Sequence, residues 1–262
     1  MTKPARSGSD LGLRTVSGIG LIVLALAALW AGGVWFWLLT SLAAMLMLAE
    51  WGDLVQSDPK HRRLALFAGC VPLAIMAPVL AAGPSFLALG LIAGAAFFIA
   101  IITNKGRLAL GIVYVALPAL ALLFLRQQPG GLLLAVWALA TVWATDIGAY
   151  AAGRSIGGPK LAPSVSPNKT WAGLIGGVVA ALLLGLCLWH FGGLGLQFAL
   201  ASPVLAVMAQ IGDLYESWLK RLAGVKDSGT LLPGHGGVLD RLDGLVPVAP
   251  AVAALVLLDR FL

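Results

Sequence analysis

The chain contains long stretches without a charged residue, and the first of them lies between Arg14 and Glu50. A single helix over that stretch would be about 50 Å long at 1.5 Å per residue, whereas the hydrocarbon core of a bilayer is about 30 Å thick. The stretch must therefore fold back once, and the Gly32–Gly33 pair is the natural turn. Only 11% of the residues are charged, compared with roughly 25% in soluble proteins, which indicates an integral membrane protein.

Further charge-free runs predict the rest of the fold by the same argument. The fold class that follows is an all-α, polytopic membrane protein with about nine transmembrane helices. A last span that contains two prolines begins at about Gly244 and is expected to be tilted or partly buried. The expected turns are Gly83–Pro84 and Gly192–Gly193, and the expected single spans are about 108–125 and about 130–150.

Lysine and arginine are distributed unevenly between the two sides of this predicted bundle. With a cytoplasmic N-terminus, only Arg126 and Arg260 fall on the outer side. Cytoplasmic loops carry the excess of basic residues, so the asymmetry predicts that orientation. The richness in Ala, Leu and Gly suits a bacterial plasma (inner) membrane. The cytoplasmic residues would be Lys3, Arg6, Arg14, Lys60, Arg62, Arg63, Lys105, Arg107, Arg154, Lys160, Lys169, Lys220, Arg221, Lys226 and Arg241.

Three acidic residues lie beside the polar segment 217–243, which falls on the predicted cytoplasmic side. Asp240 and Asp243 are three residues apart, so one helical turn would present both on the same side, and Asp213 ends the preceding span. Carboxylates suit a hard cation such as Mg²⁺, whose remaining ligands are waters and substrate phosphates. The sequence therefore predicts a Mg²⁺ site at these three acids and leaves a second metal ion open. A structural salt bridge to Arg241 is the alternative for one of them.

Basic residues and glycines run between those acids. Cations neutralise phosphate oxygens, and glycines let backbone amides approach them closely. Together with a metal this equipment indicates phosphoryl or nucleotidyl transfer, in which positioning and charge stabilisation supply most of the catalysis. A basic run that only follows the inside-positive bias is the alternative. For His235 a phosphate contact is favoured, and a general acid or base and a plain loop residue are the alternatives. The residues concerned are Lys220, Arg221, Lys226, His235, Gly236, Gly237 and Arg241.

A second polar segment, 151–170, follows the predicted sixth span. Asp146 and Tyr150 would share one face at the end of that span, and an acid in an apolar helix is by default a functional hypothesis. A hydrogen bond from Tyr150 or a loop lysine to Asp146 is the structural alternative. Ser166, Lys169 and Thr170 would supply donors at the start of the next span. The two cysteines show no spacing typical of a disulfide framework or a zinc site.

With these residues the chain resembles the phosphatidate cytidylyltransferases, also called CDP-diacylglycerol synthases. The resemblance covers roughly residues 141–244, and the first half of the chain offers only compatible hydropathy. The matching residues are Asp146, Tyr150, Gly153, Arg154, Ser166, Pro167, Lys169, Thr170, Asp213, Ser217, Lys220, Arg221, Lys226, Asp227, Pro233, His235, Gly236, Gly237, Asp240, Arg241 and Asp243.

The resemblance implies transfer of CMP from CTP to phosphatidate, which gives CDP-diacylglycerol and pyrophosphate. The implied partners are these two substrates and the lipid bilayer, with no nucleic acid and with a homodimer left open. The chain would divide into N-terminal transmembrane helices, 1–140, and a C-terminal catalytic region, 141–262. The implied catalytic residues are Lys220, Arg221, Lys226, Asp227, His235 and Arg241; the substrate-binding residues are Asp146, Tyr150, Ser166, Lys169, Thr170, Ser217, Gly236 and Gly237; the metal ligands are Asp213, Asp240 and Asp243.

Two positions depart from the family pattern and keep alternatives open. Ala172 stands where the family usually has a glutamate, and Gly244 stands where it usually has a serine. A catalytically inactive paralogue is therefore one alternative. Another membrane lipid phosphotransferase or kinase is a second, although no GxxxxGK[ST] run is present. A transporter is a third, because many transporters also have acids inside a polytopic bundle.

Overall fold

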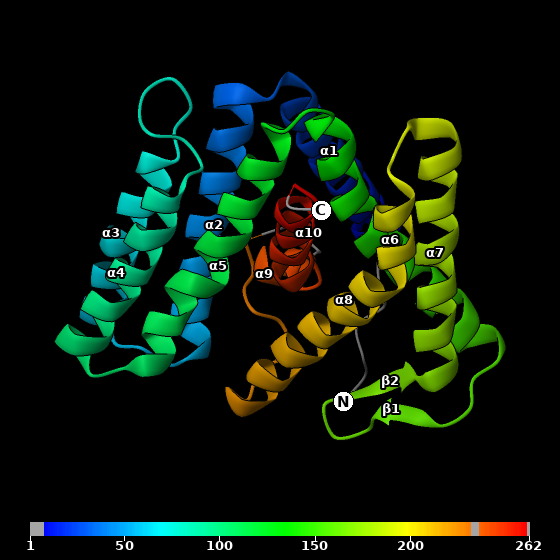
Figure 1. Cartoon of the computed structure of the whole chain (residues 1–262). Helices are drawn as coiled ribbons and strands as arrows, with labels where there is room; N and C mark the ends of the chain where they lie inside the picture. The colour runs from blue at the N-terminus through cyan, green and yellow to red at the C-terminus, as the bar shows by residue number, and fades with distance from the viewer. Residues whose placement is uncertain (1–7, 232–235, 261–262) are drawn as a thin grey trace, which may run out of the picture.

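The structure is a computed structural model of the whole chain, and it describes residues 8–231 and 236–260. Most of these residues are helical, as the charge-free runs predict (Figure 1). The helices are α1 (Gly8–Ala31), α2 (Gly33–Leu54), α3 (Pro59–Ile75), α4 (Phe86–Thr103), α5 (Gly106–Arg126), α6 (Gly131–Ser155), α7 (Trp171–Gly192), α8 (Leu196–Leu222), α9 (Leu239–Leu242) and α10 (Leu245–Asp259).

The predicted turns at glycine pairs are found where the chain must reverse. Gly32 separates α1 from α2 with φ of 63°, and Gly193 ends α7 with φ of 79°. Both angles lie in the left-handed region that glycine adopts without steric cost. Gly83 has φ of 68° and lies in the connection between α3 and α4, which is longer than the predicted two-residue turn.

The predicted count of nine membrane spans is not confirmed. Among the described residues, six helices are long and apolar enough to cross a bilayer: α2, α4, α5, α6, α7 and α8. The structure has α3 with 17 residues and α10 with 15, so at 1.5 Å per residue both are shorter than a hydrocarbon core of about 30 Å. The chain is therefore a mostly helical integral membrane protein in which α3 and the apolar α10 are shorter than the hydrocarbon core.

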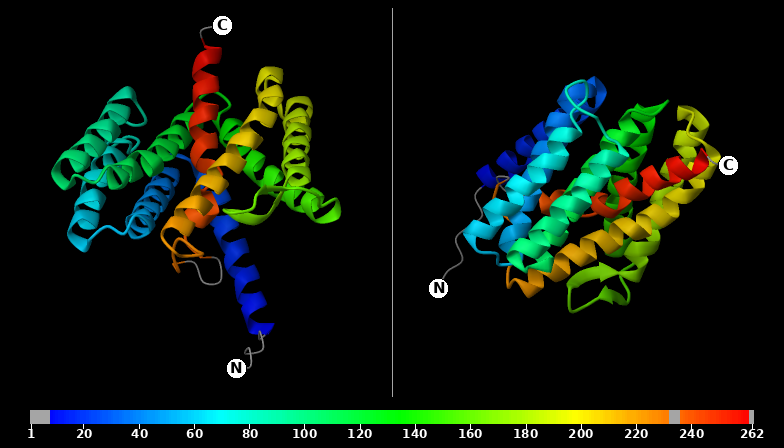
Figure 2. Two further views of the ribbon diagram at one scale, coloured as in Figure 1. Left: turned by 90° about the horizontal axis from the view of Figure 1, so that it is seen from below. Right: turned by 60° about the vertical axis from the view of Figure 1, so that its left-hand side comes forward.

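Helix α10 lies between two groups of helices and is packed against α5, α6 and α8 (Figures 1 and 2). The α1–α2 and α5–α6 turns lie at one end of the bundle (Figure 1), and Arg260 at the end of α10 donates a hydrogen bond to Gln128 in the α5–α6 connection. The α4–α5 turn and the C-terminal end of α8 lie at the opposite end (Figure 1). The polar segments that follow α6 and α8 therefore share one end of the molecule.

A small hairpin is the one departure from an all-α fold over the described residues. Strands β1 (Lys160–Ala162) and β2 (Ser166–Thr170) pair antiparallel inside the predicted loop 151–170. Thr170 ends the hairpin and begins α7, because its hydroxyl accepts a hydrogen bond of 3.0 Å from the Gly173 amide. This is the N-cap interaction that fixes the start of a helix.

Helices α6 and α7 are packed closely through small residues. A Cβ atom added to Gly176 would lie 2.3 Å from the Ala152 Cβ and 2.8 Å from the Gly148 carbonyl oxygen. Small residues at such an interface let transmembrane helices approach each other closely. The close packing of α6 against α7 therefore fixes the position of the hairpin relative to the end of α6.

Gly176→Ala is expected to destabilise the protein by about 1–3 kcal/mol, because the new methyl group overpacks this interface. The matched control is Gly94→Ala on α4, where an added Cβ meets no atom within 4 Å. The measurement is thermal unfolding of the purified variants in one detergent. Equal melting temperatures for the two variants would show that the α6–α7 interface can relax to accept a methyl group.

Candidate active site

The last three turns of α8 carry the polar side chains around which the site is built. The helix continues to Leu222, so residues 217–222 of the predicted polar segment are helical. Lys220 Nζ lies 2.7 Å from Glu216 Oε2, one turn earlier on the same helix, and 2.7 Å from Asp240 Oδ1. Glu216 is fully buried and Lys220 nearly so. The ion pairs join the end of α8 to the short helix α9.

Asp240 receives hydrogen bonds from the protein on both carboxylate oxygens. Besides Lys220, the amide of Ser228 donates to Oδ2 at 2.9 Å and the amide of Gly237 donates to Oδ2 at 2.8 Å. Burial by itself raises the pKa of Asp240, but the bonds from Lys220 and from the two amides outweigh it, and the pKa lies below the usual value. Asp240 is thus an ionised acceptor that fixes the segment between α8 and α9.

Asp213 and Asp243 lie in a second group of charges, which adjoins the first because the charge of Lys220 also acts on Asp243. Lys169 Nζ lies 2.6 Å from Asp213 Oδ2, and Ser217 Oγ donates to Asp213 Oδ1 at 3.3 Å. Burial raises the pKa of Asp243 to about 7, and the negative charges of Asp213 and Asp146 add to the shift against the 2.7 Å bond from the Gly244 amide. Asp146 of α6, Asp213 of α8 and Asp243 at the C-terminal end of α9 therefore repel one another here.

The three acids predicted to bind a metal do not gather around one point. Within the described part of the chain, no three His, Cys, Asp or Glu side chains lie close enough to hold a metal ion. Asp240 is bound by Lys220 and two backbone amides, whereas Asp213 is paired with Lys169 and its charge acts on Asp243. Two carboxylates completed by substrate phosphates and water are still a donor set that suits Mg²⁺. Asp213 and Asp243 therefore fit such an ion.

Glu216 has one carboxylate oxygen that is not satisfied by the protein. Its Oε2 binds Lys220, but its Oε1 is buried and has no hydrogen-bond partner among the described residues. A buried acceptor without a partner is costly, so such atoms mark places where water, an ion or a ligand is expected. Glu216 was not among the predicted site residues.

Glu50 of α2 is the main site residue that sequence reasoning missed. Its side chain is buried, with 3% of the residue exposed. It accepts hydrogen bonds from the amides of Val238 at 2.9 Å and Leu239 at 2.8 Å, and from the Ser228 hydroxyl at 3.1 Å. Glu50 thereby ties the N-terminal half of the chain to α9. An acid at the end of an apolar run was the available signal.

The predicted phosphate-binding glycines make room for the protein's own carboxylates. A Cβ atom on Gly236, which has φ of 82°, would lie 2.7 Å from Asp240 Oδ2. A Cβ atom on Gly237 would lie 2.1 Å from Ser228 Oγ and 2.6 Å from Glu50 Oε2. Polar groups do approach these two glycines closely, as expected, but the approaching groups are the carboxylates of Asp240 and Glu50.

The other predicted residues lie around this centre with various partners. Arg221 Nη1 donates to the Val225 carbonyl at 3.1 Å, whereas Lys226 and Asp227 are exposed. Tyr150 is exposed and accepts a hydrogen bond of 2.8 Å from Arg154. Ser166 begins β2, and Thr170 caps α7. The position of His235 lies outside the described residues.

Comparison with known proteins gives matches over nearly the whole chain. The model of the cytidylyltransferase family matches residues 12–259. The phosphatidate cytidylyltransferase of Brucella suis is 43% identical over 250 residues, which cover 92% of this chain and 91% of the relative. The protein of that name from Rickettsia bellii is 32% identical over 253 residues, covering 92% and 89%. That from Pseudomonas aeruginosa is 45% identical over 156 residues, covering 57% and 56%.

Proposed function

This chain belongs to the cytidylyltransferase family, and from that premise we infer that it is a nucleotidyltransferase that transfers CMP from CTP to phosphatidate. The products are CDP-diacylglycerol and pyrophosphate. The observation that carries the inference is the 43% identity to a phosphatidate cytidylyltransferase over 92% of the chain. A lipid kinase, a transporter and an inactive paralogue are not favoured by these relatives.

The reaction exchanges one phosphorus–oxygen bond for another. We propose that an oxygen of the phosphatidate phosphate forms a bond to the α-phosphorus of CTP. The bond from that phosphorus to the oxygen bridging the β-phosphate breaks, and its electron pair leaves on pyrophosphate. Because the attacking phosphate is already an anion, the step needs no strong base. The protein has to position three anionic groups and offset their charge.

The cations near the site are suited to this task in different ways. Lys169, beside Asp213, and the exposed Arg221 and Lys226 are proposed to contact the phosphates of CTP and to offset the charge of the departing pyrophosphate. Lys220 is nearly buried and is held by Glu216 and Asp240. We propose that it positions α9 and that it is not a direct phosphate ligand.

We propose that Asp213 and Asp243 hold a divalent cation, with Mg²⁺ the expected ion. When bound, it would neutralise phosphate charge and act as a Lewis acid at a phosphoryl oxygen. The mutual repulsion of the two carboxylates supports this assignment, because a cation between them would relieve it. Asp240 is proposed to position the loop between α8 and α9.

The site is proposed to face the cytoplasm, with the protein in the inner membrane of a bacterium. The support is the distribution of basic residues together with the shared end of the polar segments. Arg126 donates to the Leu29 carbonyl at 2.8 Å, at the α1–α2 turn, and the Arg260 guanidinium lies 5.6 Å from the Phe124 ring centre. Both arginines therefore belong to the end of the bundle away from the hairpin, and that end is proposed to face outward.

The direct test uses the purified full-length protein in mixed micelles with CTP, phosphatidate and Mg²⁺. We expect equal amounts of pyrophosphate and CDP-diacylglycerol, measured by phosphate release after pyrophosphatase and by mass spectrometry. Replacement of phosphatidate by diacylglycerol is the control for kinase chemistry and should give no product. Phosphorylated diacylglycerol in that control, or no CDP-lipid with phosphatidate at any pH or metal concentration, would contradict the proposed function.

A further inference from the structure

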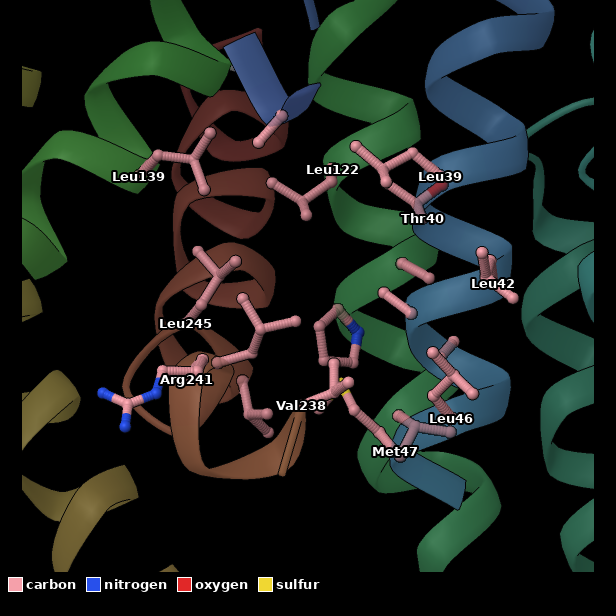
Figure 3. Close-up of a pocket in the computed structure, with 18 of the residues that line it drawn as sticks. Leu39, Thr40, Leu42, Leu46, Met47, Leu122, Leu139, Val238, Arg241 and Leu245 are labelled. Carbon is pink, nitrogen blue, oxygen red and sulfur yellow. The ribbon is translucent and has the colours of Figure 1, made fainter. Parts of the chain in front are cut away.

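An apolar cavity of about 310 Å³ lies beside the site, between α2, α5 and the α9–α10 segment, with α1 and α6 at its edges. In Figure 3, Leu122 of α5, Leu139 of α6 and Leu245 of α10 are directed toward its interior. Thr40 is a polar exception in the lining, and its hydroxyl is already donated to the Phe36 carbonyl at 2.9 Å. Binding pockets for small molecules begin at about 300 Å³, so the space suits one apolar chain better than a whole lipid.

The cavity is continuous with the lipid-facing surface of the bundle. Leu24 of α1 and Leu42 of α2 belong to its lining, yet 53% and 58% of their surfaces remain exposed. In a membrane-spanning chain such exposed leucines face hydrocarbon. An apolar chain could therefore enter sideways from the bilayer, without crossing water and without unfolding the bundle.

The cavity also adjoins the site through the same short piece of backbone. Val238, Arg241 and Leu245 line it, while Asp240 and Asp243, between them in sequence, belong to the two charge groups of the site. In Figure 3 the guanidinium of Arg241 points away from the leucines that fill the view. The stem of Arg241 thus covers apolar surface while its charged end lies at the border, the usual arrangement for a long basic side chain.

An apolar space with a cation at its border matches a ligand with a hydrocarbon tail and an anionic head. We propose that this cavity receives one acyl chain of the phosphatidate substrate, so that the phosphate is placed beside Arg241 and toward Asp243. The proposal rests on the proposed function, because it assumes that phosphatidate is the substrate. Residues of α2 and α5, which lie outside the polar segments, would then determine the selectivity for acyl-chain length.

Ala43→Phe should narrow the cavity, because Ala43 is a small lining residue of α2. We expect the KM for dioleoyl phosphatidate to rise by about tenfold, as for a hydrophobic pocket that loses room for a few methylenes. The KM for dioctanoyl phosphatidate should change much less, and the KM for CTP should stay as in the wild type. The matched control is Ala93→Phe on the exposed face of α4, which should alter none of the three constants.

A second measurement uses the wild-type protein, so it does not depend on the folding of a variant. Phosphatidate that carries a diazirine at the end of one acyl chain is photolysed on the protein in micelles, and labelled peptides are identified by mass spectrometry. We expect labels on α2 and α5 that unlabelled phosphatidate removes by competition. Labels that phosphatidate does not displace, or equal effects of Ala43→Phe on long-chain and short-chain substrates, would overturn the proposal. Absence of any CDP-lipid from the wild type would instead overturn the proposed function.

Discussion

Asp243→Asn is expected to lower turnover of CTP and phosphatidate by about 100-fold, because it removes one of two carboxylates proposed to hold Mg²⁺. The neutral amide is a weaker ligand for a hard cation, so the Mg²⁺ concentration needed for half-maximal rate should rise as well. Asp213→Asn should behave in the same way. The measurement is initial rate against Mg²⁺ concentration at saturating CTP.

Asp240→Asn is the matched control on the neighbouring helix turn, since Asp240 is bound by Lys220 and the amides of Ser228 and Gly237. The amide group of Asn would place donors against these donors, and a buried hydrogen-bonding group left unsatisfied costs about 1–3 kcal/mol. We therefore expect a lower melting temperature and an unchanged Mg²⁺ requirement. If Asp240→Asn shifts the Mg²⁺ requirement and Asp243→Asn does not, the proposed ligand set is wrong.

The course of the helices follows from the sequence because two physical limits act along the chain. A charge-free run longer than a bilayer must turn, and glycine is the residue that can adopt the left-handed angle found at Gly32. The same two limits do not determine whether a short apolar segment crosses the bilayer. Helix α10 has the composition of a span without the length, so the predicted count exceeds the count of long apolar helices among the described residues.

The sequence predicts which charged residues form the site better than it predicts which of them contact one another. The spacing of Asp240 and Asp243 suggests that they share one helix face. In the structure Asp240 accepts a hydrogen bond from Lys220 on α8, whereas burial and the charge of Asp213 raise the pKa of Asp243. That division depends on how α9 approaches α8, which no local pattern encodes. The link from Glu50 to Val238 spans 188 residues, so only the folded chain reveals it.

Glu50→Ala is expected to cost several kcal/mol of stability and to abolish most of the activity. The change leaves two buried amides and the Ser228 hydroxyl without their acceptor, and an unsatisfied buried group costs about 1–3 kcal/mol. The same carboxylate holds α9 against α2, so its loss should release the segment that carries Asp240 and Asp243. Thermal unfolding in detergent and limited proteolysis between α8 and α9 are the measurements.

Two further variants separate this role from a general effect of removing an acid from α2. Glu50→Gln keeps one acceptor oxygen and should lie between wild type and Glu50→Ala in melting temperature. Asp53→Ala, one turn later, removes an exposed partner of Arg62, and exposed pairs contribute only about 0–1 kcal/mol. Because Asp53 and Glu50 share a helix and a charge, a large difference between their alanine variants isolates the bonds to Ser228 and α9. Similar melting and proteolysis for the two would mean that α9 is held by its apolar contacts, chiefly the fully buried Leu239.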